Sequence, residues 1–360
     1  MRVGEPPGGA ARQRPRRAFN AHPRGKGARS VDRLSPARLD EILETAAGMR
    51  VLVVGDLMLD RYISGPVDRV SPEAPVPVVR VAATTAAVGG AGNVAANVVA
   101  LGATCRVVAC LGADMAGELL EAELSRLGVR TDGLVRTDER PTSEKTRVLA
   151  LRQQIVRFDV EDDRDVSVGL ARSLAEKVEQ LASESDVLVM QDYNKGVLTP
   201  SVISSVVAAG ARLGLPTVVD PKQRNFSAYG SVTVFKPNAK ELGDALGDFI
   251  HADDAEWMEA TRQRLGCQNL LLTLGEQGMA LQTEQGTAVR IPTAARGVYD
   301  VSGAGDTVTG VAAVVLAAGG TPTEAAILAN HAAAIEVGKA GVATVSPDEL
   351  RAHVAHHGAR

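Results

Sequence analysis

The chain has 360 residues, of which 45% are hydrophobic and 3% aromatic, and its formal net charge is −4. This composition supports a buried core of ordinary size, but it leaves few aromatic rings to stack on nucleic-acid bases. The apolar runs at 94–101 and 308–318 are too short to cross a bilayer. We therefore expect no membrane span and no nucleic-acid partner.

The first 38 residues differ in composition from the rest of the chain. They hold ten Arg or Lys residues and two acids, whereas the remaining positions hold 29 bases and 41 acids. A segment rich in Arg, Pro and Gly without an apolar period is typical of disorder, so we predict a disordered basic tail at residues 1–38. It lacks the apolar stretch of a secretory signal.

Cysteine usage indicates the compartment. Cys105, Cys110 and Cys267 are odd in number and lack the paired spacing of a zinc site. They fit reduced, buried thiols, and we expect a cytoplasmic protein.

Beyond the tail, apolar patterns predict alternating helices and strands. Strands are expected at 51–54, 186–190, 217–220, 232–235 and 269–273, and helices at 38–47, 170–181, 200–213, from about 238 and at 308–318. Thr199, Pro200 and Gly214 are typical end residues of the third helix. This alternation predicts an α/β fold, a doubly wound and mainly parallel sheet in one domain over residues 39–350.

Two segments interrupt the alternation. Residues 61–81 contain prolines and alternating valines, and residues 141–159 alternate apolar and polar side chains. Both patterns favour antiparallel strands with one solvated face. We expect them to pair as a small β lid at one edge of the main sheet. A lid of this kind can exclude water from a site beneath it.

The segment 300–307 combines an anion-binding turn with a carboxylate. Gly303, Ala304 and Gly305 precede an apolar helix, where small residues let successive N–H groups point at an anion. Asp306 would repel a resting phosphate. A carboxylate in that place makes sense where the anion exists mainly in a transition state and the carboxylate removes a proton beside it. This segment therefore predicts phosphoryl transfer to a hydroxyl.

A second glycine-rich segment, residues 89–97, leads into a predicted helix. Residues 90–95 match the G-x-G-x-x-G/A dinucleotide pattern, but that pattern should directly follow the first strand of a sheet. The alternative is a flat surface of Gly89 and Gly90 for a polyhydroxylated ligand, with Asn93 as a hydrogen-bonding residue. Asp60 would then lie at the carboxyl end of strand one, facing the same crevice.

Further polar residues follow other predicted strands. Asn238 and Glu241 could order water around Mg²⁺, or they could form a capping pair. The segment 273–278 could approach a nucleotide or form a plain hairpin turn. Lys195 and Lys222 lie at strand ends and could neutralise phosphate, or they could form surface ion pairs.

Two of these segments resemble a known family. Residues 89–97 and 300–310 are similar to the two signatures of the ribokinase-like (PfkB) carbohydrate kinases, and the resemblance runs from about Val51 to Ser346. Val311 departs from the pattern, which has a small Ala or Gly there. Residues 53–62, 71–78, 192–196 and 298–306 narrow the resemblance to the D-glycero-β-D-manno-heptose-7-phosphate kinases.

The resemblance implies an activity and partners. These kinases transfer the γ-phosphoryl of ATP, with Mg²⁺, to the anomeric hydroxyl of the heptose, giving the 1,7-bisphosphate for ADP-heptose and lipopolysaccharide core synthesis. They dimerise through the lid strands, and a monovalent-cation requirement stays open. In many bacteria the kinase is fused to an adenylyltransferase; because this chain ends soon after the kinase pattern, we expect the stand-alone type.

The resemblance also assigns roles to matching residues. Asp306 would be the general base, and the N–H groups around Gly303, Ala304 and Gly305 the anion hole. The sugar positions match Asp60, Gly89, Gly90 and Asn93, the nucleotide positions match Thr273, Gly275, Gly278 and Asn330, and the Asn-x-x-Glu magnesium motif matches Asn238 and Glu241.

A phosphorylated acceptor also needs cations for its distal phosphate. We place this phosphate near Lys195, Arg147 and Arg152, because these lie close to the lid and the strand ends. Asp192, in the same segment as Lys195, is added to the substrate-binding residues, and Lys222 is assigned to ATP.

Three rival interpretations stay open. The acceptor could be ribose, a fructose phosphate or a nucleoside. Residues 90–95 could serve an NAD-dependent dehydrogenase, although Asp306 would then be unexplained. The basic tail could bind nucleic acid in a regulator.

Overall fold

The computed structural model describes residues 34–150, 153–295 and 297–358. Its centre is a nine-stranded sheet that is parallel except for the two strand pairs at one edge. In spatial order the strands are β15 (Ala288–Ile291), β14 (Met279–Thr283), β13 (Asn269–Thr273), β12 (Val234–Phe235), β11 (Thr217–Asp220), β10 (Val187–Gln191), β1 (Arg50–Gly55), β6 (Thr104–Gly112) and β7 (Leu134–Thr137).

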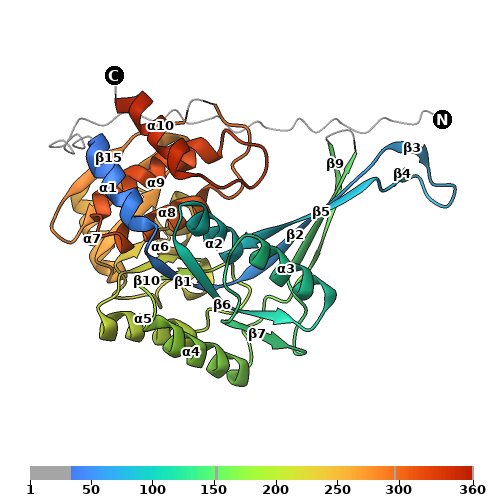
Figure 1. The fold of residues 1–360 in the computed structure, drawn as a ribbon, viewed down its shortest axis with the longest axis horizontal. Helices are drawn as coiled ribbons and strands as arrows, with labels where there is room; N and C mark the ends of the chain where they lie inside the picture. The colour runs from blue at the N-terminus through green and yellow to red at the C-terminus, as the bar shows by residue number, and fades with distance from the viewer. Residues whose placement is uncertain (1–33, 151–152, 296, 359–360) are drawn as a thin grey trace, which may run out of the picture.

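Helices cover both faces of this sheet (Figure 1). They are α1 (Pro36–Ala46), α2 (Ala91–Ala100), α3 (Met115–Arg126), α4 (Val168–Ala182), α5 (Pro200–Leu213), α6 (Ala239–Leu246), α7 (Ala255–Leu265), α8 (Ala304–Ala317), α9 (Pro322–Glu336) and α10 (Pro347–Gly358). Strand β1 shows how the two layers arise. Val51 and Val53 belong to the core beneath α1, α2, α8 and α9, whereas Leu52 and Val54 belong to the core beneath α4 and α5. A strand buried on both faces is a continuous apolar run, so the doubly wound prediction is confirmed.

A second, smaller sheet extends from one edge of the main layer (Figure 1). Its strands, in order, are β5 (Ala83–Gly90), β2 (Leu57–Ser64), β8 (Glu144–Ala150) and β9 (Gln153–Val160), and β3 (Val67–Val70) pairs with β4 (Pro77–Val79) beyond them. The predicted lid segments lie in this sheet. However, β2 and β8 run parallel, so the expectation of purely antiparallel strands was wrong. The glycine segment also contributes, because β5 ends at Gly90.

Helix ends follow the sequence signals closely. Thr199 caps α5, Pro200 is its first residue, and Gly214 follows it with a left-handed φ of +66°.

The N-terminal boundary of the domain differs from the prediction. Helix α1 begins at Pro36, capped by the Ser35 side chain, so the predicted tail boundary at residue 38 was too late. Arg38 is held in the fold through an ion pair of 2.8 Å with Glu324. The rest of the predicted tail, residues 1–33, lies outside the described residues.

The C-terminal boundary of the domain also differs from the predicted one. The domain was expected to end at residue 350, but α10 continues to Gly358 and buries Leu350 and Val354 in the core. Among the described residues, no helix is long and apolar enough to cross a bilayer.

Candidate active site

Asp306 lies at the start of α8 and is the centre of a buried hydrogen-bond network. Its carboxylate accepts three hydrogen bonds: from Asn93 Nδ2 to Oδ2 at 2.8 Å, and from Gln191 Nε2 and the Tyr193 hydroxyl to Oδ1 at 3.0 and 2.7 Å. Burial raises the pKa of Tyr193 well above its usual range, so this hydroxyl stays protonated and donates. The side chains come from α2, the end of β10 and the turn after it, which meet at the carboxyl edge of the parallel sheet.

This environment prepares Asp306 to exchange a proton near neutral pH. Burial raises the pKa of Asp306 to about 6, against the opposing effect of the hydrogen bond from Asn93. A carboxylate offers about four acceptor sites, and the three donors leave one for a further hydroxyl. Because its orientation is fixed from three sides, the group is a preorganised proton acceptor.

A second buried carboxylate, Asp220, stands beside the first. Gln191 Nε2 donates to its Oδ2 at 2.9 Å, and Lys236 Nζ pairs with the same oxygen at 3.0 Å. Its other oxygen, Oδ1, is buried without a protein hydrogen-bond partner. A hard carboxylate oxygen of this kind fits a divalent ion such as Mg²⁺ or one of its bound waters.

The glycine turn before α8 has the geometry expected of an anion site. Gly303 caps the helix with φ +96°, which favours glycine. A Cβ there would stand 2.7 Å from Asn93 Nδ2, and a Cβ on Gly305 would stand 3.6 Å from Lys236 Nζ. The helix N-terminus, the Lys236 ammonium and the Asp306 carboxylate therefore lie close together.

The first glycine segment joins the lid strand β5 to helix α2, which carries Asn93. A Cβ on Gly89 would stand 2.6 Å from Asp60 Oδ2, and one on Gly90, whose φ is +59°, would stand 2.4 Å from the Asp56 carbonyl oxygen. Asp60 thus lies against the platform as predicted. It belongs to lid strand β2, however, and not to the end of strand one, which stops at Gly55. The glycines follow β5 of the lid, so the structure lacks the strand order that a dinucleotide fingerprint needs.

The residues predicted to bind a distal phosphate come from two elements, since Arg147 belongs to lid strand β8 and Lys195 to the turn after β10. Arg147 Nη1 donates to Asp60 Oδ1 at 2.5 Å, and Lys195 pairs with Glu161 at 2.8 Å. β9 ends at Val160, opposite Glu144 at the start of β8, so Glu161, the partner of Lys195, lies roughly 10 Å from Arg147 along the strand direction. The two cations are thus paired with different carboxylates, and Arg152 lies outside the described residues.

Asp192 is more deeply embedded than the other predicted substrate residues. Its carboxylate accepts hydrogen bonds from the Tyr229 hydroxyl at 2.6 Å and from the Asn194 N–H at 2.7 Å. Burial, together with the nearby Asp56 carboxylate, raises the pKa of Asp192 to about 6. These contacts support the turn after β10, and a direct role in substrate binding stays a prediction.

The Asn238–Glu241 pair forms a capping box at α6. Asn238 Oδ1 accepts from the Glu241 N–H at 2.8 Å, and Glu241 Oε2 accepts from the Asn238 N–H at 2.9 Å. The other Glu241 oxygen contacts Lys222 Nζ, and that ammonium lies 5.2 Å from the centre of the Tyr193 ring. The capping interpretation is therefore present in the structure. In this arrangement Lys222 and Glu241 lie near Tyr193, whose hydroxyl donates a hydrogen bond to Asp306.

The predicted nucleotide residues lie at the neighbouring edge of the sheet. Thr273, the last residue of β13, bridges to Asn238 in parallel fashion. Gly275 begins a short 3₁₀ turn and Gly278 follows it, with φ of +60° and +85°. Asn330 in α9 donates to the Pro292 carbonyl oxygen at 2.9 Å. An added Cβ on Gly275 would meet no atom within 4 Å, so this turn leaves room for a ligand.

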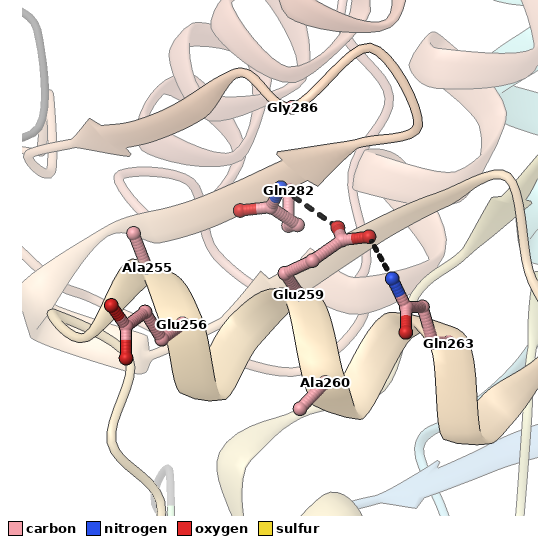
Figure 2. Close-up of a pocket in the computed structure, with 7 residues that line it drawn as sticks. All are labelled: Ala255, Glu256, Glu259, Ala260, Gln263, Gln282 and Gly286. Carbon is pink, nitrogen blue, oxygen red and sulfur yellow. Dashed lines mark hydrogen bonds between the residues drawn. The ribbon is translucent and has the colours of Figure 1, made fainter.

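A surface pocket of about 400 Å³ lies apart from these residues. Figure 2 shows it between α7 and the hairpin of β14 and β15, with Glu259 accepting hydrogen bonds from Gln282 and Gln263. None of its lining residues belongs to the network around Asp306.

Four members of the network were not among the predicted site residues: Gln191, Tyr193, Asp220 and Lys236. Gln191 ends β10, and Lys236 follows β12 directly. Their position at the carboxyl ends of parallel strands was the available signal. Both were passed over because neither residue belongs to a glycine-rich motif.

Comparisons with known proteins agree with this geometry. The chain is 45% identical over 321 residues to the Bifunctional protein HldE of Citrifermentans bemidjiense, and 43% identical over 320 residues to that of Geotalea uraniireducens. The alignments cover 88% of this chain and 66% and 65% of the two relatives. The chain thus spans about two thirds of the length of these curated relatives.

Solved structures share the fold. An Arabidopsis thaliana ribokinase complexed with ribose and ATP matches with a TM-score of 0.67 and 20% identity, over 85% of this chain and 99% of that chain. The tetrameric inhibited form of Escherichia coli phosphofructokinase-2 matches with a TM-score of 0.71 and 19% identity, over 86% and 99%. A family model described as pfkB family carbohydrate kinase matches residues 49–349. The chain belongs to the pfkB family of carbohydrate kinases.

Proposed function

We propose that the protein phosphorylates D-glycero-β-D-manno-heptose 7-phosphate at its anomeric hydroxyl, using ATP, in the synthesis of ADP-heptose for the lipopolysaccharide core. The observation that carries the proposal is the buried Asp306 carboxylate, aimed by three donors beside the glycine turn of α8. Similarity to the bifunctional HldE proteins over 88% of the chain supports the heptose acceptor. The rival within the family is another sugar, sugar phosphate or nucleoside.

The geometry suggests how the reaction proceeds. The acceptor hydroxyl takes the remaining acceptor site of Asp306, and its proton passes to this carboxylate as the oxygen attacks the γ-phosphorus. The bond from that phosphorus to the β–γ bridging oxygen breaks, and ADP leaves. N–H groups of Gly303, Ala304 and Gly305 and the Lys236 ammonium stabilise charge on the transferring group.

Magnesium fits the residues at the base of the site. We assign its contacts, direct or through water, to the unpartnered Oδ1 of Asp220 and to Glu241 and Asn238. When bound, Mg²⁺ neutralises the negative charge of the β- and γ-phosphates. Lys222, Thr273, Gly275, Gly278 and Asn330 form the proposed nucleotide side.

The substrate assignment is tested by ADP release with Mg-ATP on a panel of acceptors. Heptose 7-phosphate should be strongly preferred over fructose 6-phosphate, fructose 1-phosphate, ribose and adenosine. Preference for another acceptor would keep the kinase mechanism and refute the heptose. No turnover on any acceptor, together with nicotinamide-cofactor binding in a fluorescence titration, would refute the kinase.

Arg147 provides a test of distal-phosphate recognition. Arg147→Met should raise KM for heptose 7-phosphate about 10–100-fold, the usual effect of losing a charged hydrogen bond. KM for the heptose without its phosphate should change little. Arg157→Met is the matched control. Arg157 lies opposite Arg147 on β9, and among the described residues its ion pair is with Asp159 of the same strand. An equal rise for both sugars would mean that Arg147 orients Asp60 instead.

The pH profile follows from the Asp306 pKa of about 6. The base must be ionised, and its folded-state pKa is raised above the ordinary value of 3.8. Activity is therefore full above pH 6 and is lost as pH falls. We expect kcat/KM to decline about tenfold per pH unit well below 6. A profile flat down to pH 5 would contradict the assignment.

We further propose a homodimer formed through the lid. β9 is an edge strand, and its Ile155, Val156, Phe158 and Val160 side chains are exposed. Apolar edge strands are avoided in monomers unless something covers them.

We place the reaction in the cytoplasm. The three cysteines are free thiols, which suits a reducing compartment.

A further inference from the structure

Three histidines gather where the last helix packs on α9, at the end of the molecule opposite the lid (Figure 1). His331 belongs to α9, and His353 and His357 belong to α10. One ring nitrogen of each lies within 4.8 Å of a ring nitrogen of the other two. Among the described residues, the hydrogen-bond donors to Asp306 include no histidine, so the kinase reaction leaves this cluster unexplained.

The spacing within α10 already favours a shared ligand. His353 and His357 are four residues apart, which sets both rings on one face of the helix. Their ring centres are 4.2 Å apart and tilted by 34°. Two histidines at this helical spacing can bind one metal ion, and His331 approaches the same face from the neighbouring helix.

Hydrogen bonds fix which nitrogen atoms carry lone pairs. His357 Nδ1 lies 2.8 Å from the His353 carbonyl oxygen. A carbonyl only accepts, so this nitrogen carries the proton and Nε2 of His357 keeps its lone pair. Metal-binding histidines usually donate their second N–H to a carbonyl or carboxylate in this way.

A second hydrogen bond of the cluster joins the rings of His331 and His353. Their Nδ1 atoms are 3.0 Å apart and share one proton. Two nitrogens on a tetrahedral zinc ion, each at the usual 2.0–2.1 Å, are about 3.3 Å apart. A small opening of the pair would therefore admit an ion, with the shared proton moving to an Nε2 atom. Burial, reinforced by the two neighbouring imidazoles, lowers the pKa of His331 to about 4, so its ring is neutral at pH 7.

We propose that His331, His353 and His357 form a binding site for a divalent transition-metal ion of the zinc class, with water as the fourth ligand. Imidazole nitrogens suit such ions and not Mg²⁺, which prefers oxygen. The three side chains are only partly buried, so the ion can enter from solvent. The bound ion would join α10 to α9, and this site is independent of the Mg-ATP chemistry.

The full chain, prepared without a histidine tag and freed of metal with a chelator, gives the test. Titration with Zn²⁺ should reveal one site per chain that excess Mg²⁺ does not displace, and it should raise the thermal midpoint. Co²⁺ in the same site should give the visible absorption of four-coordinate cobalt. His331→Ala should weaken Zn²⁺ binding at least about tenfold and remove the cobalt spectrum.

His356→Ala is the matched control, since His356 lies on the same helix outside the cluster. It should bind Zn²⁺ as the wild type does. If His331→Ala fails to fold, His357→Ala in the last turn of α10 replaces it. Equal Zn²⁺ binding by the wild type and the cluster variant, or equal loss in the control, would overturn the site.

Discussion

Asp306→Asn is expected to lower turnover by about 10²–10⁴-fold, the usual contribution of a general base. The amide keeps the size of the side chain but cannot take the proton of the acceptor hydroxyl. Binding of Mg-ATP should be nearly unchanged, because the proposed nucleotide contacts come from other elements. Turnover is measured by ADP release with saturating heptose 7-phosphate, and ATP affinity by calorimetry.

The two readouts separate a chemical role from a structural one. A folded Asp306→Asn protein that binds ATP but does not turn over supports proton transfer. Near-wild-type turnover would refute it. Loss of ATP binding together with turnover would mean that Asp306 mainly holds the site together, through its contacts with Asn93, Gln191 and Tyr193.

Gly303→Ala is expected to cost about 10²–10³-fold in turnover, comparable to removing a donor from an oxyanion hole. The new methyl group would stand 2.7 Å from Asn93 Nδ2, on a backbone with φ +96°. Either the turn or Asn93 must move, so the anion site and the orientation of Asp306 change together. Steady-state kinetics with both substrates measures the effect.

Gly319→Ala controls for backbone strain. Gly319 follows the other end of α8 with φ +79°, and a Cβ there would meet nothing within 4 Å. It should lose about 1 kcal/mol of unfolding free energy without a comparable loss of turnover. Equal kinetic effects of the two substitutions would show that helix stability, not the anion turn, explains the Gly303 result.

Much of the main sheet could be predicted because its signals are local. β11 and β13 have the predicted bounds, and α5 has the predicted caps. The lid was harder. Its strand β2 pairs with β8, more than 80 residues away, and nothing local in either strand specifies a parallel partner. The pairing depends on where the crossover through α2, β6 and α3 returns the chain.

The site residues also fall into two groups, those with a local sequence signal and those without one. Asp306, its turn and Asn93 lie in glycine-rich motifs, and the structure brings them together as expected. Gln191 and Lys236 stand in ordinary strand ends, and only the order of the strands brings them to the same carboxylates. For Asn238 and Glu241, the sequence offered two interpretations because one geometry satisfies both.

The lid strands β2 and β5 leave and re-enter the main layer at a single point. There the Ala91 N–H donates to the Asp56 carbonyl oxygen at 2.9 Å, two residues before Asn93. A rotation of the lid about this point would shift the first turn of α2 and, through Asn93, the carboxylate of Asp306. In the proposed homodimer, association of the lids and alignment of the base would therefore be thermodynamically linked, and the connectivity would give a coupling free energy between the subunits.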